Sequence, residues 1–305
     1  HTMVNVTLAL DTEALSEVVV VGYGTQKRLT NTGAQSSMGG KQLEQSPTAN
    51  ISNALVGRLP GLFASQASGE PGNDQSILRI RGVGTFNGSQ EPLVLVDGIQ
   101  VDNYNNLDPS EVENITILKD ASSTAVYGIR GANGVLLITT KRGRMGKAKV
   151  SYTFNHAFNN FTDIRSQMSS FDYANSFNQA LKNDAYVTGV TYTPRYSQAD
   201  LDKYKSGEDP IFYPDVNWYE LMLKKTSSQQ RHNLSINGGT EKVRYAISTG
   251  YFNQEGLFNN TNLSAGYDAN LRLQRFNFRS NLNFNLSKHF KAAVDISTQT
   301  ALRSG

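Results

Sequence analysis

The sequence of 305 residues contains no cysteine and no long run of apolar residues. The absence of cysteine excludes disulfides and thiolate metal sites in this chain, but it does not fix the compartment, because many envelope proteins also lack cysteine. No stretch approaches the roughly 18 to 20 apolar residues that a membrane helix needs. Because only helices and closed β-barrels satisfy the backbone in lipid, any membrane span of this chain must be made of strands.

The chain also lacks a strong excess of either charge. Its 29 basic and 26 acidic residues leave a net charge of +3. This balance is too mild to indicate nucleic acid as a partner. No signal peptide opens the sequence, so we expect a mature or trimmed product.

Residues that could carry catalysis are scattered. The four histidines, His1, His156, His232 and His289, fall on expected strands and turns without the spacing of metal ligands. The acidic residues show no paired arrangement that the sequence reveals. We therefore expect no enzyme, no catalytic residues, no metal site and no cofactor.

Before residue 148, short apolar segments alternate with glycine-rich turns. The pattern predicts a compact α/β unit of about 120 residues, a usual domain size. Its expected strands are 18–21, 77–81, 93–97, 112–118 and 135–141, and its expected short helices are 51–59, with Asn50 as N-cap, and 121–127.

After residue 148, apolar and polar residues alternate in five long segments. One face is rich in Phe, Tyr and Leu and the other in Asn, Ser and Arg, which favours a lipid-facing exterior and a wet lumen. Long connections (159–228 and 253–274) alternate with short ones (238–242 and 287–289), as is typical of an outer-membrane barrel. A soluble β-sandwich is the alternative, since alternation shows only that one face is apolar.

Five strands do not close such a barrel. An open edge in lipid would leave unpaired backbone groups that cost several kcal/mol each. We therefore expect that the full polypeptide continues well beyond Gly305.

The segment from Val18 to Gly24 ends in a Gly-Tyr-Gly turn that is similar to the start of a dinucleotide-binding motif. Lys27 occupies the position of the third glycine, and no helical pattern follows. A nucleotide site is therefore not expected here. A short β-branched peptide such as this one is instead suited to adding as a strand to the sheet edge of a partner.

The same segment, LSEVVVVGYG at 15–24, resembles the TonB box of SusC-like TonB-dependent transporters. Further motifs of that family follow in the expected order: GRLPGL at 57–62, GEPG at 69–72 with ILRIRG at 77–82, PLVLVDG at 92–98, LKDASSTAVYGIRGANGV at 118–135 and ITTKRG at 138–143. Later, SINGG at 235–239 and GYFNQEG at 250–256 resemble barrel strands. One departure is Asn217 before Trp218, where the family often has Asp.

The resemblance implies a fold class and a domain order. We expect an α+β plug domain followed by antiparallel transmembrane β-barrel strands, with about 22 strands in the complete barrel. Residues 1–15 would end a preceding small β-domain, 16–25 would be the TonB box, 26–147 the plug, and 148–305 the first barrel strands, with a long extracellular loop at 159–228.

The resemblance also implies a function: TonB-dependent active import of oligosaccharide across the outer membrane of a Gram-negative, Bacteroidetes-like cell. TonB, with its inner-membrane proton-driven complex, would bind Glu17, Val18, Val19, Val20, Val21 and Gly22. A SusD-like surface lipoprotein would cover the extracellular mouth. The alternatives are an oligopeptide importer of the same family, a signal-transducing receptor and a soluble binding module.

Three groups of residues follow as candidates. In this family, plug arginines face carboxylates on the inner barrel wall, which implies such a role for Arg79, Arg81 and Arg130, with partners expected beyond Gly305. Because Arg81 lies mid-plug, we expect its loss to weaken plug retention more than loss of Arg142. Phe86, Asn87 and Gln90 lie on a loop expected to face substrate. The aromatic residues of 159–228 are expected to pack that loop or to contact a partner.

Overall fold

The computed structural model describes residues 18–21, 24–27, 35–82, 90–259 and 270–304. They form two compact units. The first comprises residues up to 157 together with 230–254 and 273–303, and the second comprises 158–229 and 255–272. No helix in the described part of the chain is long and apolar enough to cross a membrane.

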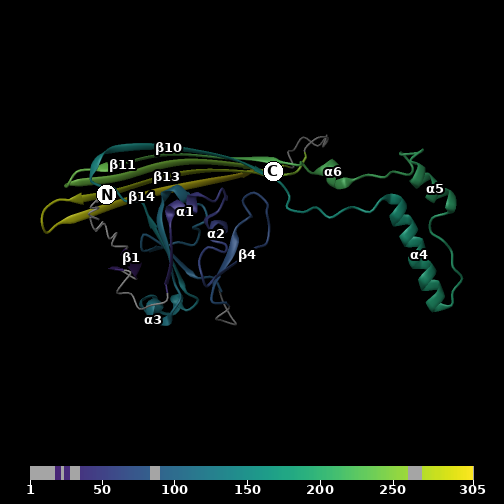
Figure 1. The fold of residues 1–305 in the computed structure, drawn as a ribbon, viewed down its shortest axis with the longest axis horizontal. Coiled ribbons are helices and arrows are strands. Elements are labelled where there is room, and N and C mark those ends of the chain that lie inside the picture. The colour runs from purple at the N-terminus through teal and green to yellow at the C-terminus, as the bar shows by residue number, and fades with distance from the viewer. Residues whose placement is uncertain (1–17, 22–23, 28–34, 83–89, 260–269, 305) are drawn as a thin grey trace, which may run out of the picture. The chain divides into compact units, whose positions relative to one another are not determined.

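The first unit contains a five-stranded mixed sheet that forms the centre of the plug (Figure 1). Its strand order is β3 (Gln35–Gly39), β8 (Val112–Leu118), β9 (Val135–Thr140), β6 (Leu93–Val96) and β7 (Ile99–Gln100). All neighbours pair antiparallel except β6 and β9, which run parallel. Strand β3 is therefore an edge strand with β8 as its one neighbour in the sheet.

Short elements complete the plug. A hairpin of β4 (Leu62–Gln66) and β5 (Ser76–Ile80) packs with α1 (Gly40–Glu44) and α2 (Ile51–Ala54) around the sheet, and η2 (Pro109–Glu111), α3 (Ala121–Thr124) and η3 (Ala125–Gly131) lie in the connections. The core is aliphatic, and Leu43, Ile51, Leu55, Ile115 and Ile117 are fully buried in it. The plug thus has a hydrophobic core of its own.

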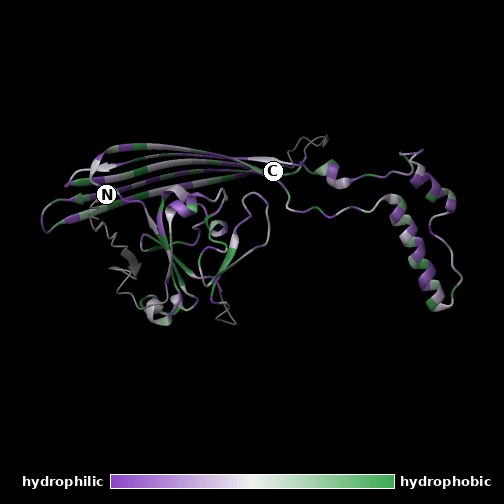
Figure 2. Ribbon diagram, viewed as in Figure 1, coloured by the Kyte–Doolittle hydropathy of each residue, from purple (hydrophilic) through white to green (hydrophobic). Residues whose placement is uncertain are grey.

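Five long strands form a second sheet in the same unit. In order they are β10 (Gly146–Asn159), β11 (Ser227–Gly239), β12 (Val243–Glu255), β13 (Arg272–Asn285) and β14 (Lys291–Ser304), each hydrogen-bonded to the next. Short turns join β11 to β12 and β13 to β14, so these neighbours are antiparallel. Polar and apolar residues alternate along the strands (Figure 2). The fold class expected from the sequence, an α+β plug followed by antiparallel strands, is confirmed.

A small hairpin lies near the start of the described chain. Strand β1 (Val18–Val21) pairs antiparallel with β2 (Gly24–Lys27), so that Val18 lies opposite Lys27 and Val21 opposite Gly24. The sequence predicted β1 as an extended segment but did not predict its pairing with β2. One edge of β1 is therefore already paired within the chain.

The second unit contains three helices that the sequence reading treated as loop: α4 (Ser170–Thr188), α5 (Gln198–Ser206) and α6 (Trp218–Met222). Helices α4 and α5 both begin at a serine N-cap and end at a left-handed glycine, Gly189 and Gly207. Aromatic rings then link the segment, with neighbouring centroids 5.2 to 6.2 Å apart along Tyr173, Phe177, Tyr196, Tyr204 and Tyr213. These five rings pack against one another within the segment, which is the first of the two roles expected for the aromatic residues of 159–228.

The strands predicted for the plug are found within one or two residues of their expected ends. A shift of one residue matters at β5, which ends at Ile80 because Arg81 has a left-handed backbone with φ of 57°. Arg79 and Arg81 are two positions apart in the strand expected at 77–81 and would have shared one face of it; because Arg81 lies outside the strand, that expectation is wrong. Helix α2 is also shorter than expected, and the Asn50 side chain bonds Asp74 instead of capping it.

Candidate functional site at the plug–sheet interface

Strand β13 turns a polar face toward the plug. Leu273, Arg275, Asn277, Arg279 and Asn281 are all buried, with 1 to 7% of each residue exposed. The alternate residues Phe276 and Phe278 are 48% and 41% exposed on the opposite face. Because side chains alternate across a strand, the pattern separates one face that contacts the plug from an apolar face directed away from it.

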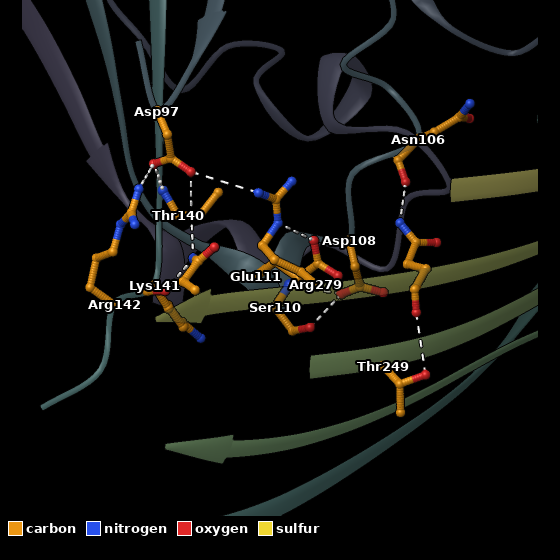
Figure 3. A network of polar contacts seen from close by, with 12 residues as sticks. Asp97, Asn106, Asp108, Ser110, Glu111, Thr140, Lys141, Arg142, Thr249 and Arg279 are labelled. Carbon is orange, nitrogen blue, oxygen red and sulfur yellow. Dashed lines mark hydrogen bonds and ion pairs between the residues drawn. The ribbon is translucent and has the colours of Figure 1, made fainter. Parts of the chain in front are cut away.

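The tight turn between β6 and β7 places a carboxylate at this interface. Asp97 and Gly98 both have positive φ (51° and 85°), as a two-residue hairpin turn requires. The Asp97 carboxylate accepts hydrogen bonds from the Thr140 backbone N–H at 2.9 Å and the Thr140 hydroxyl at 2.5 Å. Arg279 Nη1 of β13 lies 3.7 Å from Asp97 Oδ2 (Figure 3). The carboxylate is thus held by the plug and faces the sheet.

Glu111 at the end of η2 forms the most buried ion pair of the interface. Arg279 Nε donates to Glu111 Oε2 at 3.1 Å, and 9% and 2% of the two side chains are exposed (Figure 3). Burial raises the pKa of the Glu111 carboxyl, and the positive charge of Arg279 opposes that rise. Arg279 therefore lies between two plug carboxylates, Asp97 and Glu111.

Asp108 contributes a third carboxylate. It caps η2 by accepting hydrogen bonds from the Ser110 backbone N–H at 2.8 Å and the Ser110 hydroxyl at 2.5 Å. Its second oxygen lies 3.8 Å from Arg231 Nε of β11, and both side chains are almost fully buried. The cap fixes the carboxylate so that it faces the arginine.

Asparagine side chains bind the plug backbone directly. Asn277 Nδ2 donates to the Asn106 carbonyl at 2.6 Å, and Asn281 Nδ2 donates to the Lys141 carbonyl at 2.9 Å. Asn237 of β11 donates to the Arg142 carbonyl at 3.0 Å. The accepting carbonyls lie outside the plug strands, and these side-chain amides give them hydrogen-bond donors.

Arg142, which follows β9, forms an ion pair in which the plug supplies the cation and the sheet supplies the carboxylate. Its guanidinium contacts Asp295 of β14 and lies 3.6 Å from Asp97. Burial lowers its pKa, but the hydrogen bond to Asp295 and the charge of Asp97 outweigh that effect, so the pKa is raised overall. The interface therefore joins plug carboxylates to sheet arginines and one plug arginine to a sheet carboxylate.

This arrangement is that of a domain docked on the polar wall of a strand sheet. A model of the TonB-dependent Receptor Plug Domain family matches residues 27–135. TonB-dependent receptor P26 of Formosa agariphila is 35% identical over 97% of this chain and 28% of its own length. TonB-dependent receptor SusC of Bacteroides thetaiotaomicron is 33% identical over 94% of this chain and 27% of its own length.

The chain belongs to the SusC-like TonB-dependent receptors. A solved structure of the RagAB peptide importer in its open-open state matches the fold, with a TM-score of 0.73 and 26% identity over 94% of this chain and 32% of that one. The chain spans less than a third of the length of each of these relatives.

Within this receptor, the arginines expected to pair with the barrel wall lie elsewhere. Arg81 forms an ion pair with Asp120 of the plug at 2.7 Å, and Arg130 donates to Gln100 of the plug at 2.7 Å. Arg79 lies on β5, and its Nε has no hydrogen-bond partner in the described part of the chain. Pairing of these three residues with wall carboxylates stays a prediction.

The remaining candidates are placed only in part. Val18, Val19, Val20 and Val21 form β1, whereas Glu17 and Gly22 fall outside the described residues. Phe86 and Asn87 also fall outside them, and Gln90 lies half-buried just before β6. The roles of these residues in binding TonB or substrate stay predictions.

The sequence patterns did not predict the roles of the interface carboxylates Asp97, Asp108 and Glu111 or of their partners Arg231, Arg275 and Arg279. One signal was present in the pattern itself. Arginine and asparagine recur at every second position from 275 to 281, so one strand face carries charge and amide groups together. Such a face requires a polar partner when it is buried.

We predict that Arg142→Ala weakens plug docking more than Arg81→Ala does, which reverses the order expected from the sequence. The Arg81 side chain is 54% exposed and pairs within the plug, so its loss costs at most about 1 kcal/mol. Loss of Arg142 leaves the nearly buried Asp97 with one cation fewer and costs about 2 kcal/mol. Protease sensitivity of the plug in the full-length receptor measures both, and greater sensitivity of the Arg81→Ala variant would refute this order.

The raised pKa of Glu111 predicts a pH dependence. Since the docked state binds this proton more tightly than the unfolded chain, its stabilising contribution is lost as pH rises from the ordinary value of 4.5 through the folded pKa. Glu111→Gln removes this contribution. The free energy of unfolding of the wild type minus that of the variant, measured from pH 4 upward, is therefore expected to fall with pH; a difference that rises with pH contradicts the assignment.

Proposed function

We propose that the complete receptor imports oligosaccharide across the outer membrane in a TonB-dependent way, through a barrel whose lumen this plug closes. The observation that carries the proposal is the docking of a plug with its own core on the polar face of strands whose other face is apolar. Strands of 13 or 14 residues are long enough to cross a bilayer. The barrel of about 22 strands is part of this proposal.

The β1 strand is the proposed attachment point for TonB. It forms a two-stranded sheet with β2, so the described residues leave its second edge without a strand neighbour. A partner strand that adds to this edge would form backbone hydrogen bonds along Val18–Val21. The proton-driven inner-membrane complex would then pull on the chain at a point that precedes the plug.

The proposed partner on the outer surface is a SusD-like lipoprotein that covers the extracellular mouth. The support for it is the family alone, since SusC is among the relatives. Phe86, Asn87 and Gln90 remain the proposed substrate contacts of the plug. A receptor that also signals through plug movement is the remaining alternative of a different class.

An oligopeptide is the second candidate substrate. The fold likeness to RagAB, a peptide importer, favours it, whereas the expectation of glycan derives from the SusC-like family as a whole. Competition between labelled oligosaccharides and labelled oligopeptides for uptake by cells that express the receptor discriminates the two. Glycoside hydrolases or peptidases encoded beside the receptor would point in the corresponding direction.

We predict that deletion of Glu17 to Gly22 abolishes energised uptake and leaves surface binding of substrate intact. The point variant Val20→Pro removes a backbone donor from β1 and is expected to lower uptake at least about tenfold. Val20→Thr keeps a β-branched residue and the N–H and is the matched control. Normal uptake by the deletion strain would exclude β1 as the attachment point.

A further inference from the structure

Two arginines and a phenylalanine of the sheet enclose one short plug segment, just before α2. The guanidinium groups of Arg231 and Arg275 lie 5.3 and 4.9 Å from the centre of the Phe252 ring. Arg231 Nη2 donates to the Thr48 carbonyl at 2.6 Å, and Arg275 Nη2 donates to the Ala49 carbonyl at 2.8 Å. We refer to Arg231, Phe252 and Arg275 as the arginine socket.

The arginine socket is buried and binds main chain. Arg275 and Phe252 are each 1% exposed, and the Ala49 methyl group packs with Phe252 and Leu273. Arg275 also donates to the Asn105 carbonyl at 3.3 Å. Hydrogen bonds from a charged donor are stronger than neutral ones, and the three bonds to Thr48, Ala49 and Asn105 are made in a buried environment of low dielectric. This contact is therefore costly to break.

The plug segment that precedes the arginine socket is held differently. Among the described residues, none from Gln35 to Glu44 makes a hydrogen bond or ion pair to β10–β14. This segment consists of edge strand β3 and the five-residue helix α1. Its side-chain contacts to the rest of the plug include the exposed pair Lys141–Glu44. Met38 and Leu43 anchor the segment in the plug core, so its release breaks contacts within the plug but no hydrogen bond or ion pair to the described strands of the sheet.

We propose that the arginine socket is the point at which release of the plug stops. This inference rests on the proposed function: force applied at β1 frees β2, β3 and α1 in turn and then meets the contact of Thr48 with the arginine socket. About 27 residues separate Val21 from Thr48, and at about 3.4 Å per extended residue they supply roughly 90 Å of chain. Their departure uncovers one edge of β8, while the rest of the plug stays docked. Arg231 and Arg275 are thus positioning residues for import.

Buried reporters on either side of the socket test this division. Met38 on β3 and Ala54 on α2 are 3% and 1% exposed, and the chain contains no cysteine. In full-length receptor in living cells, otherwise free of cysteine, Met38→Cys or Ala54→Cys is labelled with a small maleimide, with and without a protonophore. We expect the proton-motive force to raise labelling about tenfold at position 38 and less than about twofold at position 54.

Loss of the socket should move this boundary. With Arg231→Met and Arg275→Met together, energised labelling at position 54 is expected to rise to the level at position 38. Arg244→Met is the matched control, because the side-chain Nε of this β12 arginine has no hydrogen-bond partner in the described part of the chain. If the double variant fails to assemble, the single variants are each expected to give a smaller energised rise.

Two results would overturn the socket as the stopping point. One is energised labelling at position 54 that stays at the wild-type level in the assembled socket variants while position 38 responds. The other is labelling at position 54 that rises equally with and without the protonophore, since the socket would then maintain the folded plug in general. An absence of energised labelling at position 38 in wild-type receptor that still takes up substrate would refute the release of β3 and leave the proposed function intact, whereas loss of energised uptake itself would refute the proposed function.

Discussion

The burial of Arg279 between two plug carboxylates is the constraint on which the rest of the interface depends. A guanidinium withdrawn from water is stable only with charged and hydrogen-bonding partners, and here those partners, Asp97 and Glu111, belong to a different domain. Neither the strand nor the plug satisfies its own charges alone. Because docking buries these charges, each surface depends on the other for its partners, and loss of one partner leaves a charge buried and unpaired.

Local elements of the plug orient these carboxylates toward the sheet. A two-residue turn with two positive φ angles fixes Asp97, and η2 fixes Asp108 and Glu111 at its two ends. Strand β13 presents to them a face on which arginine and asparagine alternate. Most side chains of the sheet that contact the plug donate to carbonyl or carboxylate oxygens of the plug. A domain with its own hydrophobic core can keep these groups in place while one of its segments is released, as the proposed import cycle requires.

The sequence predicted the elements of this structure better than their contacts. Strand β8 has the expected bounds, and the five strands of the second sheet follow directly from their alternation. The pairing of Arg81 with Asp120 was not predictable, because it depends on a left-handed residue that ends β5 early. Helices α4 and α5 were missed because polar and aromatic residues dominate them, although their serine caps and terminal glycines were visible signals.

The distribution of charges across the interface differs most from the prediction, because most of the paired arginines belong to the sheet and their carboxylates to the plug. The arginines of the plug were predicted to pair with the barrel wall because they lie within family motifs. Those of β13 lie in an alternating pattern that predicts only a lumen-facing side. A strand pattern states which face is polar but not what covers it. That information comes from residues 170 positions away, such as Asn105 opposite Arg275, and the fold alone brings them together.

A double-mutant cycle on Glu111→Gln and Arg279→Met measures the central interaction most directly. Unfolding free energies of the plug in the wild-type receptor, both single variants and the double variant give the coupling between the two side chains. An interface maintained by this buried pair predicts that Arg279→Met, which leaves Glu111 without this cation, is strongly destabilised and that the loss is smaller when Glu111→Gln is also present, with a coupling of about 1.5 kcal/mol or more. Additive losses, with a coupling near zero, would show that the pair does not hold the plug to the sheet.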